Sequence, residues 1–207
     1  MYILDWIMVP IQIIIFLFTV YYFLIGVNGL WRKKEKKILT PQKTFAVIVA
    51  AHNESAVIGQ LVDNLKMLDY PKELYDIFVI ADNCTDNTAQ IARDCGAIVH
   101  ERFNDKERGK GFAMEWMFAR LFEMKRKYDA VAIFDADNLV DKRFLLEMNN
   151  RLCKGDKLVQ GYLDAKNPYD TWVSGTFAIA FWVIDHIWHL AKTNIGLSSV
   201  LGGTGMC

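Results

Sequence analysis

Short apolar runs alternate with longer amphipathic ones from Thr44 to about Tyr162. This alternation is typical of an α/β domain with a mostly parallel sheet flanked by helices. The apolar runs predict strands at residues 45–51, 77–81, 97–100, 130–134 and 157–162. The amphipathic runs predict helices at residues 55–68, 85–94, 109–127 and 142–152, and an aromatic helix follows at 171–190.

A different pattern occupies the first 31 residues, which hold one acid, Asp5, and no base. The run from Trp6 to Leu24 is apolar and has about the 20 residues that a helix needs to cross a bilayer. It lacks the basic start and the small-residue cleavage site of a signal peptide, so we interpret residues 1–31 as a retained transmembrane helix. The basic run at residues 32–37 opens a linker that extends to residue 43. Because basic residues mark cytoplasmic flanks, we expect a single-pass protein of the cell membrane with its main domain in the cytosol. The same run would also attract anionic lipid.

Composition narrows the class of protein. The 207 residues carry 24 Lys and Arg against 24 Asp and Glu, so no basic surface of a nucleic-acid-binding protein is expected. The four cysteines have no Cys-x-x-Cys spacing and no neighbouring histidines, which excludes an evident zinc site or disulfide framework.

Polar side chains follow the predicted strands, where ligands of open α/β sheets bind. Asp135 and Asp137 come directly after the fourth apolar run. Two carboxylates this close repel each other unless a cation shares them, and Mg²⁺ or Mn²⁺ prefers such oxygen ligands; the alternative is a solvated turn. After the second run, Asp82 could accept a hydrogen bond from a nucleobase, whereas Asp86 is expected to cap a helix.

Two further groups lie on predicted helices. Arg108-Gly109-Lys110-Gly111 opens a long helix, where two cations and glycine backbone suit a diphosphate, although a plain glycine-rich turn is the alternative. His186 and His189 lie three apart, and we interpret them as interfacial or core residues rather than metal ligands. Their aromatic helix contains Asp185, which argues against a second span, so we expect it on the membrane or under a substrate groove.

Taken together and in this order, the motifs resemble the family 2 inverting glycosyltransferases with the GT-A fold. The motifs are Ala50-Ala51-His52-Asn53-Glu54, Asp82-Asn83-Cys84-Thr85-Asp86-Asn87-Thr88, Arg108-Gly109-Lys110-Gly111, Asp135-Ala136-Asp137-Asn138 and a closing Gly202-Gly203-Thr204-Gly205-Met206-Cys207 that looks like an acceptor-side loop. The resemblance implies a GT-A nucleotide-sugar-binding domain at 44–165 and an incomplete acceptor-side part at 166–207.

The resemblance also implies roles for single residues. Asn53 and Glu54 would line the nucleoside pocket, and Asp82 would read the uracil edge. Arg108 and Lys110 would lie near the diphosphate. Asp135 would face the ribose and the metal, and Asp137 would bind the metal directly.

The implied activity is metal-dependent transfer of glucose or N-acetylglucosamine from a UDP-sugar to a lipid or polysaccharide. The chain departs from the family pattern where Ala50 or Ala51 replaces a proline, and the acidic pair that supplies the general base is expected beyond Cys207. Alternatives are a catalytically silent nucleotide-sugar-binding module and a sugar nucleotidyltransferase. The second would need a glycine-rich phosphate loop after the first strand, where His52-Asn53-Glu54 stands instead.

Overall fold

The computed structural model describes residues 3–31 and 38–207, with side chains from Trp6 onward, so the basic run at 32–37 lies outside the described residues. The chain forms two compact units. One comprises Met1–Glu35 with Tyr162–Val200, and the other comprises Lys36–Gly161 with Leu201–Cys207. Residues 201–207, which we grouped with the preceding helix, thus lie in the sheet unit.

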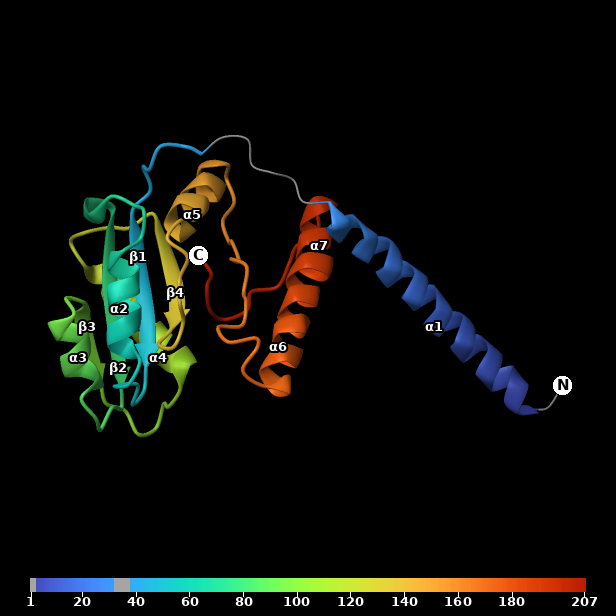
Figure 1. Ribbon diagram of the computed structural model, residues 1–207, viewed down its shortest axis with the longest axis horizontal. Helices are drawn as coiled ribbons and strands as arrows, with labels where there is room; N and C mark the ends of the chain where they lie inside the picture. Colours follow the sequence, from blue (N-terminus) through green and yellow to red (C-terminus); the bar gives the residue numbers. More distant parts are fainter. Residues whose placement is uncertain (1–2, 32–37) are drawn as a thin grey trace. The chain divides into compact units, whose positions relative to one another are not determined.

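The sheet unit is built on four parallel strands in the order β3-β2-β1-β4 (Figure 1). The strands are β1 (Phe45–Ala51), β2 (Tyr75–Asp82), β3 (Ile98–Arg102) and β4 (Ala130–Asp135). Their carboxyl ends meet at one edge, because Ala50 pairs with Asp135, Ala51 with Ala81 and Asp82 with Arg102. The predicted α/β fold with a parallel sheet is therefore confirmed.

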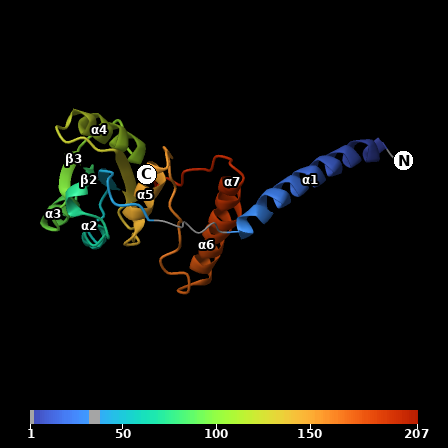
Figure 2. The ribbon, with the colours of Figure 1, turned by 90° about the horizontal axis from the view of Figure 1, so that it is seen from above.

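Helices cover both faces of this sheet (Figure 2). They are α2 (Ile58–Lys66), α3 (Thr88–Asp94), α4 (Lys110–Glu123) and α5 (Phe144–Cys153), with a short 3₁₀ turn η2 (Lys72–Leu74) before β2. Successive side chains of a strand point to opposite faces. Val47 and Val49 accordingly belong to the core under α2 and α5, whereas Ile48 belongs to the core under α4.

Three predicted helices of the sheet unit begin or end three or more residues away from their predicted bounds. Helix α2 begins at Ile58 rather than Ser55, and its N-cap residue is Val57, which makes no side-chain capping bond. The Ser55 amide donates to Asp86 Oδ2 at 3.2 Å. Helix α3 begins at Thr88 rather than Thr85. Helix α4 ends at Glu123, short of the predicted residue 127.

The prediction of a strand at 157–162 is also wrong. This segment pairs with the last residues of the chain through an isolated bridge instead of forming a regular strand. Met206 forms isolated antiparallel bridges to Gln160 and to Ile133 of β4. The Cys207 amide donates to Val159 O at 2.8 Å, and the Gly205 amide donates to Ile133 O at 2.8 Å. The returning chain therefore lies along the edge of β4, between that strand and residues 159–161.

The other unit contains α1 (Ile3–Val27), a 3₁₀ turn η1 (Asn28–Leu30), α6 (Trp172–Trp182), a π-helical segment η3 (Val183–His189) and α7 (Leu190–Asn194). Residues Trp6–Leu30 form a helix that is long and apolar enough to cross a membrane, by length and composition. The aromatic helix begins one residue later than predicted, after a capping box of Thr171 and Ser174, and continues through η3 to Asn194.

Two close contacts join these helices within the unit. Gly29 lies directly on the backbone of η3, since a Cβ there would come within 2.4 Å of His186 O. Asn194 Nδ2 donates to Asn28 O at 2.8 Å and to Trp31 O at 2.7 Å. The turn η1, which follows α1, is thus packed on η3 and α7 by a glycine and a side-chain amide.

Candidate functional site

A cavity of about 710 Å³ opens at the carboxyl edge of the sheet. It contains every residue that the sequence predicts for donor and metal binding, together with backbone neighbours of the same loops. The lining residues are Ala50, Ala51, His52, Asn53, Glu54, Asp82, Asn83, Thr85, Arg108, Gly109, Lys110, Ala113, Asp135, Ala136 and Asp137. The parallel register explains this convergence, because motifs far apart in the chain follow strands that end at the same edge.

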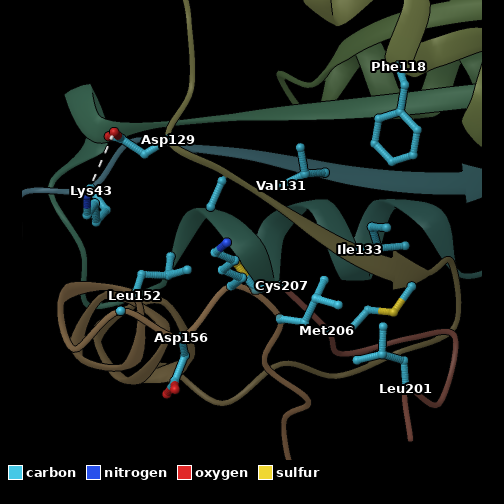
Figure 3. A pocket seen from close by; sticks show the side chains of 14 residues that line it. Lys43, Phe118, Asp129, Val131, Ile133, Leu152, Asp156, Leu201, Met206 and Cys207 are labelled. Atoms are coloured by element: carbon cyan, nitrogen blue, oxygen red, sulfur yellow. Dashed lines mark ion pairs between the residues drawn. The ribbon is translucent and has the colours of Figure 1, made fainter.

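A second cavity of about 570 Å³ lies beside β4 (Figure 3). Its lining is largely apolar and includes Val131, Ile133 and Met206. Within this lining, Lys43 Nζ lies 4.0 Å from Asp129 Oδ1. None of the predicted donor or metal residues lines it. The polar cavity at the strand ends is therefore the candidate site.

The loops after β1 and β2 are locked to each other on one side of this cavity. Asn53 and Asn83 adopt left-handed backbone conformations, with φ of 55° and 51°, which asparagine tolerates better than most residues. Asn53 Oδ1 accepts a hydrogen bond from the Thr85 amide at 2.8 Å. The N-cap residue of α3 is Asn87, without a side-chain capping bond, but Asp86 Oδ1 accepts from the Thr88 amide of the first turn at 3.0 Å. Hydrogen bonds, first that of the Thr88 hydroxyl, lower the pKa of Asp86 to about 2.

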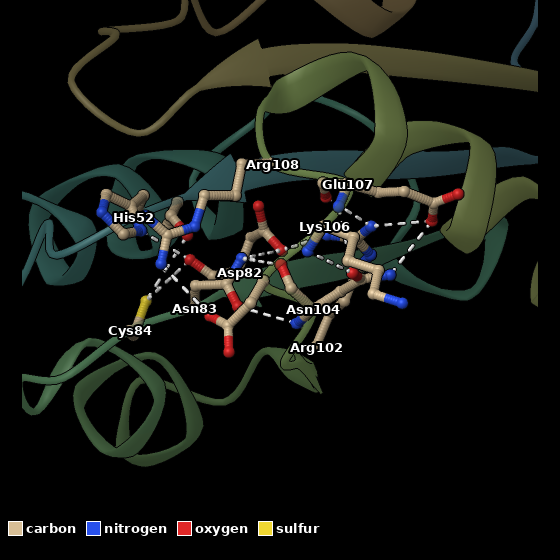
Figure 4. Close-up of polar contacts among 11 residues, drawn as sticks. His52, Asp82, Asn83, Cys84, Arg102, Asn104, Lys106, Glu107 and Arg108 are labelled. Carbon is tan, nitrogen blue, oxygen red and sulfur yellow. Dashed lines mark hydrogen bonds and ion pairs between the residues drawn. The ribbon is translucent and has the colours of Figure 1, made fainter.

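Asp82 ends β2 and is paired with an arginine that sequence reasoning missed (Figure 4). Arg102 Nη1 donates to Asp82 Oδ1 at 2.7 Å, and both side chains are buried. Asn83 Nδ2 donates to the same oxygen at 3.2 Å. His52 Nδ1 lies 2.7 Å from Asp82 O, so the ends of β1 and β2 are also joined. The signal for Arg102 is its register opposite Asp82, which appears only once the strand order is known.

The loop before α4 brings two cations to the cavity. Gly109 has a φ of 109°, which favours glycine, and α4 begins at the next residue. The Lys110 ammonium donates to the Asp135 carboxylate and to Gly203 O, the latter at 2.6 Å. Arg108 is exposed and pairs with Asp105 at 3.1 Å. A helix start with two nearby cations is a suitable place for an anion.

The closing glycine-rich loop packs on the turn after β4. The Asp135 amide donates to Thr204 Oγ1 at 3.0 Å and to Asn138 Oδ1 at 3.1 Å, and the Thr204 hydroxyl donates to Asn138. Gln160, a residue that sequence reasoning missed, also binds this loop, because its Nε2 donates to Thr204 O at 2.9 Å. These bonds place the Gly203-Thr204-Gly205 backbone beside Asp135.

The donor set for a metal ion consists of two carboxylates. Asp135 is half-buried and bonded to Lys110, and Asp137 is exposed with a 3.4 Å contact from Asn138 Nδ2. Across residues 3–31 and 38–207, no group of three or more His, Cys, Asp or Glu side chains is placed to hold a metal ion. This set fits Mg²⁺ or Mn²⁺, which commonly bind through one or two carboxylates and complete their shells with substrate phosphates and water.

The two histidines of the aromatic helix lie in the other unit. His189 Nδ1 is 3.0 Å from Asp185 Oδ1, while Asp185 Oδ2 accepts from the Leu163 amide at 2.8 Å. Trp182 stacks on His186, with ring centroids 5.3 Å apart. Both histidines are therefore engaged within the helical packing, as expected for core or interfacial residues.

Comparisons with known proteins identify the family. Residues 41–207 match the model of the "Glycosyltransferase like family 2". A beta-monoglucosyldiacylglycerol synthase from Nostoc sp. strain PCC 7120 is 32% identical over 122 residues, which are 56% of this chain and 25% of that relative. Protein RfbJ from Shigella flexneri is 30% identical over 131 residues, which are 63% of this chain and 93% of RfbJ.

Solved structures show the same fold. Mannosyltransferase PcManGT from Pyrobaculum calidifontis, solved with GDP-Man and Mn²⁺, superposes with a TM-score of 0.53 at 23% identity, over 75% of this chain and 45% of that one. Glucosyl-3-phosphoglycerate synthase from Mycobacterium tuberculosis, solved with UDP, gives a TM-score of 0.50 at 23% identity, over 66% of this chain and 52% of that one.

The chain spans a quarter of the length of the Nostoc synthase, at 25%. The family match nevertheless covers the whole sheet unit from β1 onward and the closing glycine-rich loop. The resemblance drawn from the strand-end motifs is thereby confirmed, and the chain belongs to the glycosyltransferase-like family 2.

Proposed function

We propose that this chain forms the donor-binding, membrane-anchored part of a glycosyltransferase that uses a UDP-sugar, glucose or N-acetylglucosamine, and inverts the anomeric carbon. The observation that carries the proposal is the single cavity at the carboxyl edge, lined by Asn53, Glu54, Asp82, Arg108, Lys110, Asp135 and Asp137. A lipid acceptor is favoured over a polysaccharide, because the Nostoc relative is named for a diacylglycerol product.

The charges of the cavity suit the parts of such a donor. Asp82 can accept a hydrogen bond from the nucleobase, and Glu54 can accept from ribose hydroxyls. Arg108 and Lys110 lie at the start of α4, where cations and backbone amides favour the diphosphate. The Lys110 ammonium donates to the Asp135 carboxylate, and a bound diphosphate would compete for it.

Asp135 and Asp137 would hold Mg²⁺ or Mn²⁺. When bound, such an ion acts as a Lewis acid that neutralises the charge on the departing nucleoside diphosphate. The residues of this chain then orient the donor, while the acceptor hydroxyl needs a general base. We assign that base to none of the acids described here.

The membrane part of the proposal rests on α1, whose residues from Trp6 to Leu24 have exposed side chains along an apolar helix. Helix α6 has no buried residue, and Trp172 and Phe177 are among its exposed aromatic side chains. Exposed aromatic and aliphatic side chains of this kind suit the membrane interface. We propose that α1 anchors the chain, that α6 contacts the lipid surface and that the sheet unit faces the cytosol.

The proposal is tested by calorimetry of UDP binding to the full chain in detergent micelles with Mn²⁺. We expect Asp137→Ala to weaken UDP binding at least about tenfold, ~1.4 kcal/mol, when Mn²⁺ is present. Without the metal, wild type and variant should bind UDP equally. The control is Glu115→Ala, which removes an exposed carboxylate of α4 outside the cavity.

Equal UDP affinity of wild type and Asp137→Ala in Mn²⁺ would remove Asp137 from the metal site. Sugar transfer separates the enzyme from the silent module. If the chain binds UDP-sugar but transfers no sugar to lipid and hydrolyses no donor, it acts as a binding module.

A further inference from the structure

Arg102 is a buried charge directly behind the candidate nucleobase pocket. It ends β3 opposite Asp82, which ends β2, and its side chain is 3% exposed. Nη1 donates to Asp82 Oδ1 at 2.7 Å. Arg102 is not among the residues that line the cavity, whereas Asp82 is. Any effect of Arg102 on a ligand must therefore pass through a neighbour.

The same guanidinium also holds the loop that leads to the cations. Nη2 donates to Glu107 O at 2.8 Å, and Glu107 Oε2 lies 3.6 Å away (Figure 4). Asn104 fixes the other side of this loop, because its Oδ1 accepts from the amides of Lys106 and Glu107 at 2.9 and 3.0 Å. Arg102 thus links the Asp82 carboxylate to the segment that carries Arg108 and Lys110.

A contribution to the stability of the fold does not by itself explain why Arg102 and Asp82 are buried as an ion pair. A buried ion pair often contributes no more than apolar residues of the same volume, because both charges lose their water. In addition, Arg102 Nε is buried and has no hydrogen-bond partner within the described part of the chain. A buried group that is left unsatisfied calls for another explanation, and its position beside Asp82 supplies one.

The two oxygens of the Asp82 carboxylate have different hydrogen-bonding roles. Oδ1 accepts from Arg102 and from Asn83 Nδ2. Oδ2 has no partner among residues 38–207, so it is the oxygen left for a ligand. The guanidinium beside it compensates the negative charge, and an ionised carboxylate accepts hydrogen bonds but donates none.

We infer that Arg102 is a positioning residue that fixes Asp82 so that Oδ2 accepts the ring N–H of a nucleobase. This inference rests on the proposed function and gives a physical basis for its choice of nucleobase. Uracil and guanine carry a hydrogen on the ring nitrogen of the pairing edge, whereas cytosine and adenine carry a lone pair there that an acceptor repels. The contact therefore favours bases with a ring N–H, among them the uracil of the proposed UDP-sugar, over cytosine and adenine.

The test compares UDP with 3-methyl-UDP, in which a methyl group replaces the ring N–H. Calorimetry on the full chain in detergent micelles with Mn²⁺ gives the ratio of the two dissociation constants. We expect wild type to bind UDP at least about tenfold more tightly, and Arg102→Lys to reduce the ratio to about threefold or less. Arg102→Lys keeps the charge but cannot reach Asp82 and Glu107 O with one planar fork.

The ratio separates positioning from folding. A variant that only loosens the fold weakens UDP and 3-methyl-UDP together and leaves their ratio unchanged. The matched control is Arg93→Lys. Arg93 lies on α3 and forms an exposed ion pair with Glu101, the neighbour of Arg102 on β3, so this variant should keep the wild-type ratio. Asp82→Asn should also lower the preference for UDP over 3-methyl-UDP. Adding Arg102→Lys to Asp82→Asn should not change this preference further.

Distinct results overturn distinct claims. If wild type binds UDP but Arg102→Lys keeps its full preference over 3-methyl-UDP, Arg102 does not position Asp82. If wild type binds UDP and 3-methyl-UDP equally, Asp82 does not read the ring N–H, although the proposed donor function stands. If wild type binds neither nucleotide, the proposed function fails and the inference with it.

Discussion

Asn149 shows how one buried side chain can satisfy the backbone of a distant segment. It lies on α5, is fully buried, and its Oδ1 accepts from the amides of Gln42 and Lys43 at 3.1 Å each. Its Nδ2 donates to Thr40 O at 3.2 Å. The adjacent Asn150 accepts from the Leu39 amide at 2.7 Å. The extended segment just before β1 therefore obtains its hydrogen bonds from a helix more than a hundred residues later in the chain.

We predict that Asn149→Ala lowers the free energy of unfolding of the sheet unit by about 2 to 4 kcal/mol, because it removes a fully buried side chain whose oxygen accepts from two backbone amides. Urea denaturation monitored by tryptophan fluorescence measures the change. The control is Asn87→Ala, since Asn87 is exposed and makes no side-chain capping bond, and it should change the value by less than about 0.5 kcal/mol. Equal effects of the two variants would contradict the role of Asn149.

The residues of the candidate site fall into two groups when sequence and structure are compared. Asp135, Asp137 and Lys110 stand in short local motifs at strand or helix ends, so their chemistry is visible in the sequence. Arg102 and Gln160 are partners at long range, and nothing in their own neighbourhood marks them. Their importance follows from which strands pair and where the chain returns, and neither is encoded in a local pattern.

At the scale of elements, the sequence predicts which segments are helical better than it predicts the residue at which each helix begins. Periodicity defines which segment is helical, but the first turn depends on where its polar groups find partners. Ser55 could cap α2, but the N-cap residue is Val57, and the Ser55 amide donates to Asp86 in the loop after β2. Helices α2 and α3 therefore both begin three residues later than predicted. The false strand at 157–162 has the same origin, because its partner is the distant Met206.

Asp86 leads to a prediction about pH. Its pKa is lowered from an ordinary 3.8 to about 2, first by the Thr88 hydroxyl. A carboxyl whose pKa is lower in the folded state stabilises the fold above its unfolded pKa, and this contribution is lost as the pH falls toward the folded pKa. We expect Asp86→Asn to be less stable than wild type at pH 6 and the two urea midpoints to converge between about pH 4 and 2.

Denaturation curves at several pH values between 6 and 2.5 measure this convergence. The variant Thr88→Val removes the hydroxyl but keeps Asp86, so its pH dependence over this range should be weaker than that of wild type. A constant difference between wild type and Asp86→Asn at every pH would show that the loss comes from hydrogen-bond geometry and not from the charge.

At the scale of the molecule, hydropathy separates α1 from the rest, but the composition of each unit is not visible in the sequence. One unit is assembled from the first residues and from 162–200, and the other takes back the last residues of the chain. Gly29 is an example of what such an assembly needs, since its missing side chain admits the backbone of η3. A glycine near the end of an apolar run gives no sign of which later helix it will contact.

The proposed anchor can be tested with two charges in the middle of α1. Ile14 and Phe18 are both exposed on this helix, and an arginine at the centre of a membrane span costs about 2.5 to 3.5 kcal/mol on insertion scales. We expect the full chain with Ile14→Arg and Phe18→Arg to leave the membrane fraction after alkaline extraction, whereas wild type stays. Flotation on a density gradient distinguishes membrane-bound chain, which rises, from aggregate, which sinks. The matched control is Phe103→Arg with Phe122→Arg, two exposed aromatic residues of the sheet unit, and it should float like wild type. If the α1 variant floats as well, α1 is not the element that holds the chain, and the exposed aromatic side chains of α6 become the anchor to test next.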